Sequence, residues 1–326
     1  MMRSLNILSW IKFILEPFIL LKRQVTFRRS ILYTRYLRNE HIREKTIMYE
    51  VDKGESMDKG PGAIYQALID NNQFKHIWVY NGEVEKLEGY IDQENVEYVQ
   101  LYSRKYFKYL SSVKFLINNS DFPPCFQKKE GQVFINTLEQ HSTAISDSKQ
   151  FSNIQRNLLH TDILAASSNA AAQEVLAMFK VKGLFSGQLE SLSTIIRIIE
   201  EDAELERQES NKKNILLYCG GFLNNGITTS VINLLNHIDY SKYNVVLIER
   251  QKMDPVFLSN ISKVNKRVHI LHRVGRMNMS IFEFYCNKYI TRKGLRSNVA
   301  KQLLPEELYE REYKRLFGNV KFNVVI

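Results

Sequence analysis

The residues best suited to chemistry stand in the run CGGFLNNGITTS, at positions 219–230. The run joins an apolar segment with the character of a buried strand to a segment with helical spacing. Gly220, Gly221 and Gly226 allow the backbone to turn tightly and to approach a ligand closely. Thr228 and Thr229 are placed as cap or first-turn residues of the helix, and the exposed amides there attract phosphate or another anion.

We therefore expect this turn to bind a phosphate group or the substrate. The residues expected to do so are Gly220, Gly221, Asn225, Gly226, Thr228 and Thr229. The alternative is a glycine-rich structural turn with an ordinary helix cap. Neither GxGxxG nor a Walker loop is present, so the run predicts no dinucleotide or ATP site.

Metal sites and disulfides are not indicated. Cys125, Cys219 and Cys286 lie far apart without CxxC spacing, which is typical of reduced thiols in a cytoplasmic protein. The sequence offers no acidic DxD pair in a convincing loop, so no metal and no bound cofactor are expected. Tyrosines and basic residues alternate at 98–109, but their helical spacing favours packing over nucleic-acid binding.

Alternating strands and helices must position the candidate residues. The apolar runs predict strands at 46–52, 76–80, 96–101, 113–119, 132–137 and 162–168. Helices are expected at 61–71, 103–112, 150–159 and 169–179. This alternation is typical of a parallel sheet with crossover helices, and hence of a Rossmann-like α/β fold. Ligands bind at the carboxyl ends of such strands, so residues 118–124, 137–147 and 166–169 should line the cleft.

A second α/β unit is expected after a charged stretch at 199–213 that contains no aromatic residue. Its predicted strands are 214–221, 243–249, 267–272 and 321–326, and its predicted helices are 228–238, 254–264 and 305–317. The domains expected are a helical segment at 1–45, a first unit at 46–205, a linker at 206–213 and a second unit at 214–326. A buried parallel strand at 321–326, with no helix after it, predicts that the second unit is incomplete and the chain truncated.

Basic charge is concentrated at the N-terminus. The first 45 residues hold ten basic and three acidic residues, a surplus of seven out of a net charge of +10. Residues 5–21 are apolar at helical spacing, which favours a helix lying in the headgroup region of an anionic membrane surface. The residues expected to contact it are Trp10, Phe13, Lys22, Arg23, Arg28 and Arg29. The alternatives are a helix packed on its own domain, a spanning helix or a signal peptide, but Lys12, Glu16 and Pro17 interrupt the run.

The second unit resembles a known glycosyltransferase module. The stretch GGFLNNGITTSVINLLNHIDYSKYNVVLI is similar to the opening of the module with two Rossmann domains that uses nucleotide sugars. Modules of this form accompany glycerophosphotransferase domains in teichoic-acid enzymes. The resemblance covers about 214–250 well and 251–326 more loosely, and it implies a fold of the two-domain glycosyltransferase type.

The first unit resembles the CDP-glycerol glycerophosphotransferase family, which acts in teichoic acid biosynthesis. The segments that carry the resemblance are GPGAIYQALID, WVYN, KYLSSVKFLINNSDFPPCFQKKEGQVFINT and NLLHTDILAASSNAA, within about 46–200. Enzymes of this family transfer glycerol phosphate from CDP-glycerol to a growing lipid-linked polymer. The resemblance implies an acceptor cleft at Asn118, Asn119, Asn136 and Thr137.

One loop departs from the family pattern. Where the family has Trp-His-Gly-Thr-Pro, this chain has Leu-Glu-Gln-His-Ser at 138–142. The family histidine resembles a general base, so its counterparts here are Glu139 or His141. A carboxylate can serve as a base when burial raises its pKa. The loss of the loop's glycine and proline nevertheless favours a non-catalytic first domain.

The sequence therefore predicts a transferase of teichoic-acid-type cell-wall polymer synthesis, peripheral at the cytoplasmic face of the cell membrane. The donor would be nucleotide-activated, either a UDP-sugar or CDP-glycerol, and the acceptor a lipid-linked polymer. Other polymer-assembly enzymes are possible partners, and no nucleic acid is expected. The alternatives are a non-catalytic polymer-binding scaffold at the membrane and an inactive product of a truncated gene.

Overall fold

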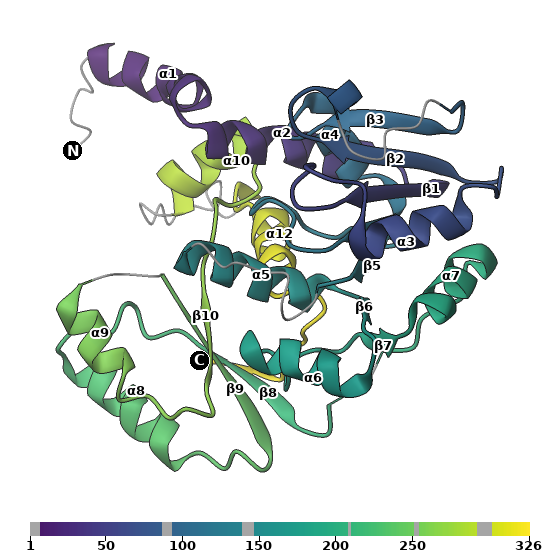
Figure 1. Ribbon diagram of the computed structural model, residues 1–326. Helices are drawn as coiled ribbons and strands as arrows, with labels where there is room; N and C mark the ends of the chain where they lie inside the picture. The colour runs from purple at the N-terminus through teal and green to yellow at the C-terminus, as the bar shows by residue number, and fades with distance from the viewer. Residues whose placement is uncertain (1–6, 87–92, 139–146, 208–209, 251–253, 292–301) are drawn as a thin grey trace.

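The computed structural model describes residues 7–86, 93–138, 147–207, 210–250, 254–291 and 302–326. Two helices come first, α1 (Ile7–Arg23) and α2 (Val25–Asn39), separated by Gln24 in an extended conformation. Two parallel sheets follow, one above the other in Figure 1, with α1 projecting from the upper one. The predicted α/β class, with parallel sheets behind an N-terminal helix, is confirmed.

The first sheet has seven parallel strands in the order β3-β2-β1-β4-β5-β6-β7. The strands are β1 (Arg43–Glu50), β2 (Lys75–Tyr80), β3 (Val96–Gln100), β4 (Val113–Asn118), β5 (Val133–Asn136), β6 (Ile163–Ala165) and β7 (Gln188–Glu190). The chain moves outward in one direction from β1 and in the other from β4. The point where the order reverses therefore lies between β1 and β4, where α/β sheets commonly bind ligands.

Helices cover both faces of this sheet. They are α3 (Lys59–Leu68), α4 (Arg104–Leu110), α5 (Ser148–His160), α6 (Asn169–Met178) and α7 (Leu192–Glu201), with a short 3-10 turn at Val84–Lys86. Successive residues of a strand point to opposite faces. Accordingly Tyr49 packs with α3 and α7, whereas Met48 packs with Tyr33 of α2 and Tyr106 of α4. Both faces of β1 are buried over its last five residues, and the apolar run Ile47–Tyr49 lies within this part.

The second sheet has four parallel strands in the order β10-β9-β8-β11. The strands are β8 (Lys213–Leu217), β9 (Tyr243–Glu249), β10 (His269–His272) and β11 (Val324–Val325). The helices are α8 (Gly226–His237), α9 (Pro255–Ile261), α10 (Ile281–Tyr285) with a π-helical extension at Cys286–Thr291, and α12 (Glu306–Phe317). The prediction of a buried strand at 321–326 is wrong about the burial. β11 is a two-residue edge strand, and Val325 is 68% exposed.

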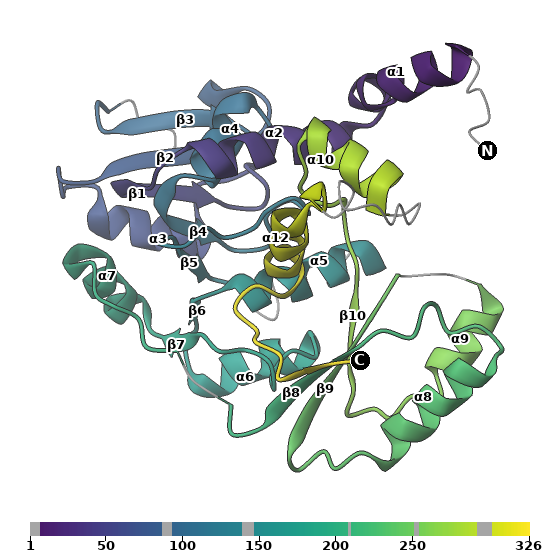
Figure 2. The same ribbon diagram turned by 180° about the vertical axis from the view of Figure 1, so that it is seen from behind.

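The two sheets share one apolar core. Leu158 and Leu164 of the first unit pack in the same cluster as Leu216 and Val246 of the second. Helix α12 returns to the first unit and contacts α5, as Figures 1 and 2 show. The domain limits drawn from the sequence stay a prediction, because the apolar contacts continue across the proposed linker.

Candidate functional site

The predicted acceptor residues meet at the carboxyl edge of the first sheet. Asn118 ends β4 and Asn136 ends β5, and the two stand opposite each other in the strand register. The amide of Thr137 donates to the carbonyl of Asn118 at 2.8 Å, which continues the pairing beyond the strands. The structure therefore brings three of the four predicted residues together on adjacent strands.

Most of their side-chain groups shape the loops. The Asn136 carboxamide donates to the Ser120 carbonyl at 3.1 Å and accepts from the amide of Leu138 at 2.8 Å. The Asn118 oxygen accepts from the amide of Ser120. Within the described part of the chain, two buried atoms here have no hydrogen-bond partner, Nδ2 of Asn118 and Oγ1 of Thr137. The set therefore combines groups that hold the loops with these two buried atoms, which the described residues leave unpaired.

The fourth predicted residue, Asn119, belongs to a neighbouring cluster at the end of β1. Its carboxamide exchanges two hydrogen bonds of 2.9 Å with the amide and the carboxylate of Asp52. The Asp52 carboxylate also lies 2.5 Å from the ammonium of Lys59, at the start of α3. A Cβ on Gly60 would lie only 2.6 Å from the Cβ of Thr137, so the first turn of α3 rests directly against β5.

Backbone strain is concentrated at this edge. Asp52, Lys53, Lys59 and Tyr102 all have positive φ, between 46° and 62°, which is costly for residues with a side chain. Asp58 precedes α3 without capping it through its side chain. Strained loops and a helix start without a side-chain cap thus surround the point where the strand order reverses.

A buried acidic residue beside the point where the strand order reverses was missed by the sequence analysis. Glu50, the last residue of β1, is 2% exposed and accepts a hydrogen bond of 2.8 Å from the hydroxyl of Tyr106. Burial raises the pKa of Glu50 to about 8, although the bond from Tyr106 opposes the rise. The nearby Asp121 carboxylate adds to the rise. The signal available in the sequence was a carboxylate within the strand predicted at 46–52.

Lys53 provides the opposite charge. Its ammonium lies 3.1 Å from the buried carboxylate of Asp121. Burial lowers the pKa of Lys53, but the attraction of Asp121 outweighs burial and leaves the pKa above its ordinary value. The guanidinium of Arg29, a predicted membrane residue, lies 3.5 Å from the ring centre of Tyr102 and so belongs to this edge as well. Lys53, Lys59 and Arg29 together give the edge exposed or half-exposed positive charge.

The glycine-rich turn lies at the carboxyl end of β8. Gly220 and Gly221 have φ values of +79° and +116°, which only glycine adopts readily. A Cβ on Gly220 or Gly226 would meet nothing within 4 Å, so the space in front of the turn is open. Thr228 and Thr229, predicted as cap or first-turn residues, lie in the first turn of α8 and do not cap it. Asn225 caps α8 by accepting from the amide of Thr228 at 2.9 Å, because the chain is still extended at Asn225 and already helical at Thr228.

A hollow of 520 Å³ adjoins this turn. Its lining includes the predicted residues Asn225, Thr228 and Thr229, together with Lys263. Thr228 is buried, with its hydroxyl 3.8 Å from the sulfur of Cys219. The amide of Cys219 donates to the carboxylate of the buried Glu249 at the end of β9, at 3.1 Å. The turn is therefore held to β9 by the bond from Cys219 to Glu249, while Gly220 and Gly226 face open space.

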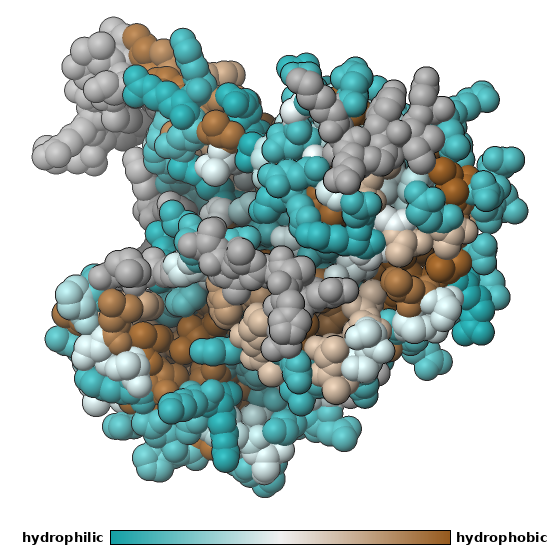
Figure 3. Space-filling view, in the orientation of Figure 1, coloured by the Kyte–Doolittle hydropathy of each residue, from teal (hydrophilic) through white to brown (hydrophobic). Residues whose placement is uncertain are grey.

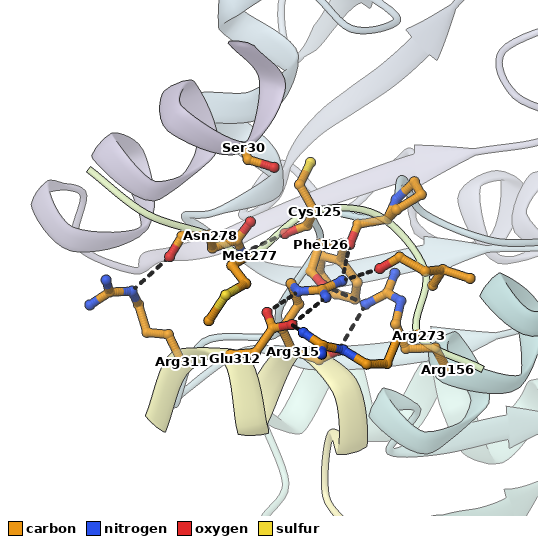
Figure 4. A network of polar contacts seen from close by, with 12 residues as sticks. Ser30, Cys125, Phe126, Arg156, Arg273, Met277, Asn278, Arg311, Glu312 and Arg315 are labelled. Atoms are coloured by element: carbon orange, nitrogen blue, oxygen red, sulfur yellow. Dashed lines mark hydrogen bonds and ion pairs between the residues drawn. The ribbon is translucent and has the colours of Figure 1, made fainter. Parts of the chain in front are cut away.

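A buried network fastens the second unit to the first (Figure 4). Arg315 of α12, 1% exposed, binds the carboxylate of Glu312 at 2.7 and 2.9 Å. Its guanidinium also donates to the carbonyls of Pro124 and Val274 at 2.7 and 2.8 Å. Arg156 of α5 donates to the carbonyl of Arg315 at 3.2 Å, and burial, together with the nearby Arg315, lowers the pKa of Arg156 to about 9.

Apolar side chains also line part of the space between the units. A hollow of 240 Å³ lies between α5 and α9, lined among others by Phe151, Phe257, Ile261 and Ile270. Brown apolar side chains gather at the lower left of Figure 3, over this part of the molecule.

The predicted bases Glu139 and His141 lie outside the described residues, in the segment that follows β5 and Leu138.

Helix α1 turns its apolar side outward. Ile11, Ile14, Leu15, Phe18 and Ile19 are each 44–53% exposed. The carboxylate of Glu16 instead faces the second unit, where it binds the ammonium of Lys288 and the hydroxyl of Tyr289. Lys22, Arg23 and Arg28 are exposed, whereas the side chains of Trp10 and Phe13 lie outside the described set. Among the helices that the structure describes, none has the length and apolar character required to cross a bilayer.

Comparison with known proteins supports the first resemblance. Residues 31–187 match the family described as CDP-Glycerol:Poly(glycerophosphate) glycerophosphotransferase. This range includes β1 to β6 and all four predicted acceptor residues. The match stops before the glycine-rich turn, so the resemblance of the second unit to a glycosyltransferase module stays a prediction. No curated protein sequence matches the chain.

Solved structures to which the chain is similar include those of wall teichoic acid polymerase TagF. One TagF structure has a TM-score of 0.44 at 14% identity, over 95% of this chain and 92% of that one. A second has a TM-score of 0.43 at 14% identity, over 98% and 95% of the two chains. The UDP-GlcNAc 2-epimerase from Neisseria meningitidis has a TM-score of 0.25 at 10% identity, over 73% of each chain.

Proposed function

We propose that this chain is a transferase of teichoic-acid-type polymer synthesis, which moves glycerol phosphate from CDP-glycerol to a lipid-linked acceptor. The observation that carries the proposal is the match of residues 31–187 to the glycerophosphotransferase family. The matched range contains the edge at which the strand order reverses, with its buried polar groups and its lysines. An α/β sheet places its ligands at such an edge.

The acceptor would lie over the ends of β1, β4 and β5. Its phosphate groups would contact Lys53 and Lys59, whose side chains are 40% and 46% exposed. These lysines already pair with Asp121 and Asp52, so a phosphate would share or replace those contacts. Nδ2 of Asn118 and Oγ1 of Thr137 would supply the remaining polar contacts. Glu139 or His141 would remove the proton from the acceptor hydroxyl, so that its oxygen can attack the donor phosphorus.

The donor would bind at the glycine-rich turn. Gly220, Gly221 and Gly226 leave the backbone accessible there, and the amino end of α8 favours a negative charge. Asn225, Thr228 and Thr229 line the adjoining hollow. The same geometry suits the diphosphate of CDP-glycerol or of a nucleotide sugar.

The protein would act at the cytoplasmic face of the membrane, held by α1. The exposed stripe on α1 has the spacing that inserts into the acyl boundary, and its C-terminal end carries Lys22 and Arg23 beside anionic headgroups. The same orientation would bring the lipid-linked acceptor close to the first sheet. Other polymer-assembly enzymes would be its neighbours on this surface.

A second candidate is a non-catalytic polymer-binding protein of the same membrane surface. The observation that favours it is the sequence at 138–142, where Leu-Glu-Gln-His-Ser replaces the family's Trp-His-Gly-Thr-Pro. Such a protein would bind the polymer and leave every nucleotide-activated donor intact.

Variants of the predicted bases separate the two candidates. The assay follows radiolabelled glycerol phosphate from CDP-glycerol into a lipid-linked primer in vesicles. We expect transfer to fall by about a hundredfold or more in either Glu139→Ala or His141→Ala, the usual effect of losing a general base. The exposed Glu55 serves as a control, and Glu55→Ala should transfer normally. Equal transfer in all three variants would remove both residues from the mechanism.

A further inference from the structure

A basic groove lies at the amino ends of the strands of the second sheet. Two adjoining hollows of 280 and 600 Å³ form it, and they share Gly183 and Lys212. The floor comes from the residues that begin β8, β9 and β10, and one wall is the turn that follows α6. We call it the amino-end groove. It is separate from the glycine-rich turn, which lies at the other end of β8.

Positive charge is the property that its lining residues share. The cations are Lys180, Lys182, Arg207, Lys212, Lys213, Lys266, Arg267 and Lys321. Neither hollow is lined by a single aspartate or glutamate among its described residues. A concave surface with one sign of charge concentrates the opposite ion more strongly than scattered surface lysines do.

Most of this charge is not neutralised by the protein. Lys182, Lys213 and Lys266 take part in none of the ion pairs found among the described residues, and the same holds for Lys180, Arg267 and Lys321. Arg207 lies 3.8 Å from Asp162, but that carboxylate already binds the ammonium of Lys128. The ammonium of Lys212 donates to the neutral carbonyl of Tyr240 at 2.7 Å. Among the described residues, the groove therefore presents mainly cations without an ion-pair partner.

Neutral polar residues hold the groove in shape. The buried carboxamide of Asn244 donates to the carbonyl of Gly183 at 2.9 Å and to the side-chain oxygen of Asn214 at 3.1 Å. Asn214 in turn donates to the carbonyl of Lys321 at 2.9 Å. These bonds tie the turn after α6, the start of β8 and the approach to β11 into one frame. Anion binding would therefore require little ordering of the backbone.

The position of the groove decides which polyanion it suits. Helix α1 stands at the top of the molecule in Figures 1 and 2, and the second sheet lies at the bottom. A flat bilayer that takes up the apolar stripe of α1 would not reach a concave surface beneath the second sheet. A flexible, linear chain of phosphates can follow a groove of this kind and extend from it toward the membrane.

We propose that the amino-end groove binds a phosphodiester polymer, at a segment remote from the end that reacts. Anion binding follows from the groove itself, whereas the identity of the polymer as a growing poly(glycerol phosphate) chain rests on the proposed function. The groove would hold the product of earlier transfers while the free end occupies the carboxyl edge of the first sheet. Retention of this kind raises the local concentration of the acceptor end.

The test measures binding of a fluorescently labelled poly(glycerol phosphate) chain by anisotropy at two salt concentrations. The groove variant combines Lys182→Glu, Lys266→Glu and Arg267→Glu. We expect it to bind at least about tenfold more weakly and with a shallower salt dependence, because each lost phosphate contact reduces counterion release by about one ion. Circular dichroism and thermal melting check that it folds.

A matched control makes the same change of charge elsewhere. It combines Arg104→Glu, Arg197→Glu and Lys314→Glu, three exposed cations on other helices. This control should bind the polymer like the parent protein, and equal weakening of both triple variants would overturn the proposal. Both should bind phosphatidylglycerol vesicles normally, and loss of vesicle binding by the groove variant would assign the groove to the membrane instead.

Activity distinguishes this proposal from the proposed function. Transfer of glycerol phosphate to a very short primer should be unchanged in the groove variant, while long products become rarer. A parent protein that binds the polymer through the groove but transfers nothing would contradict the transferase and leave the groove standing. A parent protein that transfers glycerol phosphate without measurable affinity for the polymer would contradict the groove alone.

Discussion

Polar residues are buried and hydrogen-bonded at the carboxyl edge of the first sheet, but exposed around the second sheet. At the carboxyl edge of the first sheet, Glu50, Asp121 and Asn118 are at most 3% exposed and nearly all their polar atoms are bonded within the protein. Around the second sheet, the glycine-rich turn faces open space and the amino-end groove carries exposed, largely unpaired cations. The first arrangement fixes geometry, and the second attracts anions.

The cause of the difference lies in how the sheets are covered. Helices α2 and α4 cover one face of the first sheet and α3 and α7 the other, so a polar residue at its edge is enclosed and requires a partner. The second sheet has four strands, and exposed residues such as Lys212 and Lys213 lie at the amino end of β8. We therefore expect the first unit to orient the substrate and the second unit to attract anions.

The largest expected effect tests whether the two units act as one body. Arg315→Ala leaves Glu312 buried beside Arg273 alone and two carbonyls without a donor. Breaking a buried ion pair on one side costs about 3–5 kcal/mol, so the free energy of unfolding in urea should fall by that amount. Lys314→Ala, one residue earlier on the exposed face of α12, should change it by less than about 0.5 kcal/mol. Two separate unfolding transitions in Arg315→Ala would show that this contact couples the units.

The pH dependence of stability tests whether Glu50 is buried and protonated at the carboxyl edge of the first sheet. Because the pKa of Glu50 is about 8 in the folded state and 4.5 ordinarily, the folded protein keeps a proton that the unfolded chain releases. Its contribution is complete at low pH and is lost as the pH rises through about 8. Between pH 4.5 and about 8, the free energy of unfolding would fall by up to about 1.4 kcal/mol per pH unit because of this group.

Removing the titrating group tests this assignment. Glu50→Gln keeps an oxygen that accepts from Tyr106 and should abolish that part of the slope, leaving a protein more stable than the parent at pH 8. The exposed Glu55→Gln should leave the slope unchanged. Urea unfolding between pH 5 and pH 8.5 measures it, and parallel curves for the parent and Glu50→Gln would contradict a buried, protonated Glu50.

A third comparison sets the outward side of α1 against exposed apolar residues elsewhere. Ile14→Ser with Phe18→Ser should weaken sedimentation with anionic vesicles by about a hundredfold, because each apolar side chain contributes roughly 1.5 kcal/mol on burial. Leu192→Ser with Ile227→Ser removes two other exposed apolar side chains and should leave vesicle binding unchanged. Equal losses in both pairs would count against α1 as the anchor.

The smallest expected effect concerns the open turn. Gly220→Ala meets no atom but must adopt a φ of +79°, which costs about 1 kcal/mol of stability. Asn225→Ala loses the cap of α8 at a similar cost of about 1 kcal/mol. If the turn binds the donor, both variants should also raise the KM for CDP-glycerol; unchanged kinetics would make the turn purely structural.

Much of the first unit was predictable because its signals are local. Apolar runs mark the strands, and the resemblance to the glycerophosphotransferase family marked Asn118 and Asn136, which the structure places at the ends of adjacent strands. Burial of Glu50 could also have been suspected from its place in the strand predicted at 46–52. The two threonines were predicted as cap or first-turn residues of α8, because the exact first residue of a helix is poorly determined by sequence pattern.

The rest depends on contacts between distant parts of the chain. Arg315 reads as one more charge on a polar helix, and only its approach to Pro124 and Val274 makes it a buried link. The amino-end groove draws its cations from segments between 180 and 321, so no window of sequence contains it. β11 was expected to be buried because its residues are apolar, but its place at the sheet edge leaves Val325 exposed.

The most direct test of the central claim is the transfer reaction itself. Purified protein on anionic vesicles with a lipid-linked glycerol phosphate primer would receive radiolabelled CDP-glycerol, and the lipid fraction would be counted over time. The account predicts that label enters the lipid fraction and that CMP is released in equal amount. Intact CDP-glycerol after prolonged incubation, with the polymer still bound by the protein, would contradict the transferase and leave a polymer-binding protein in its place.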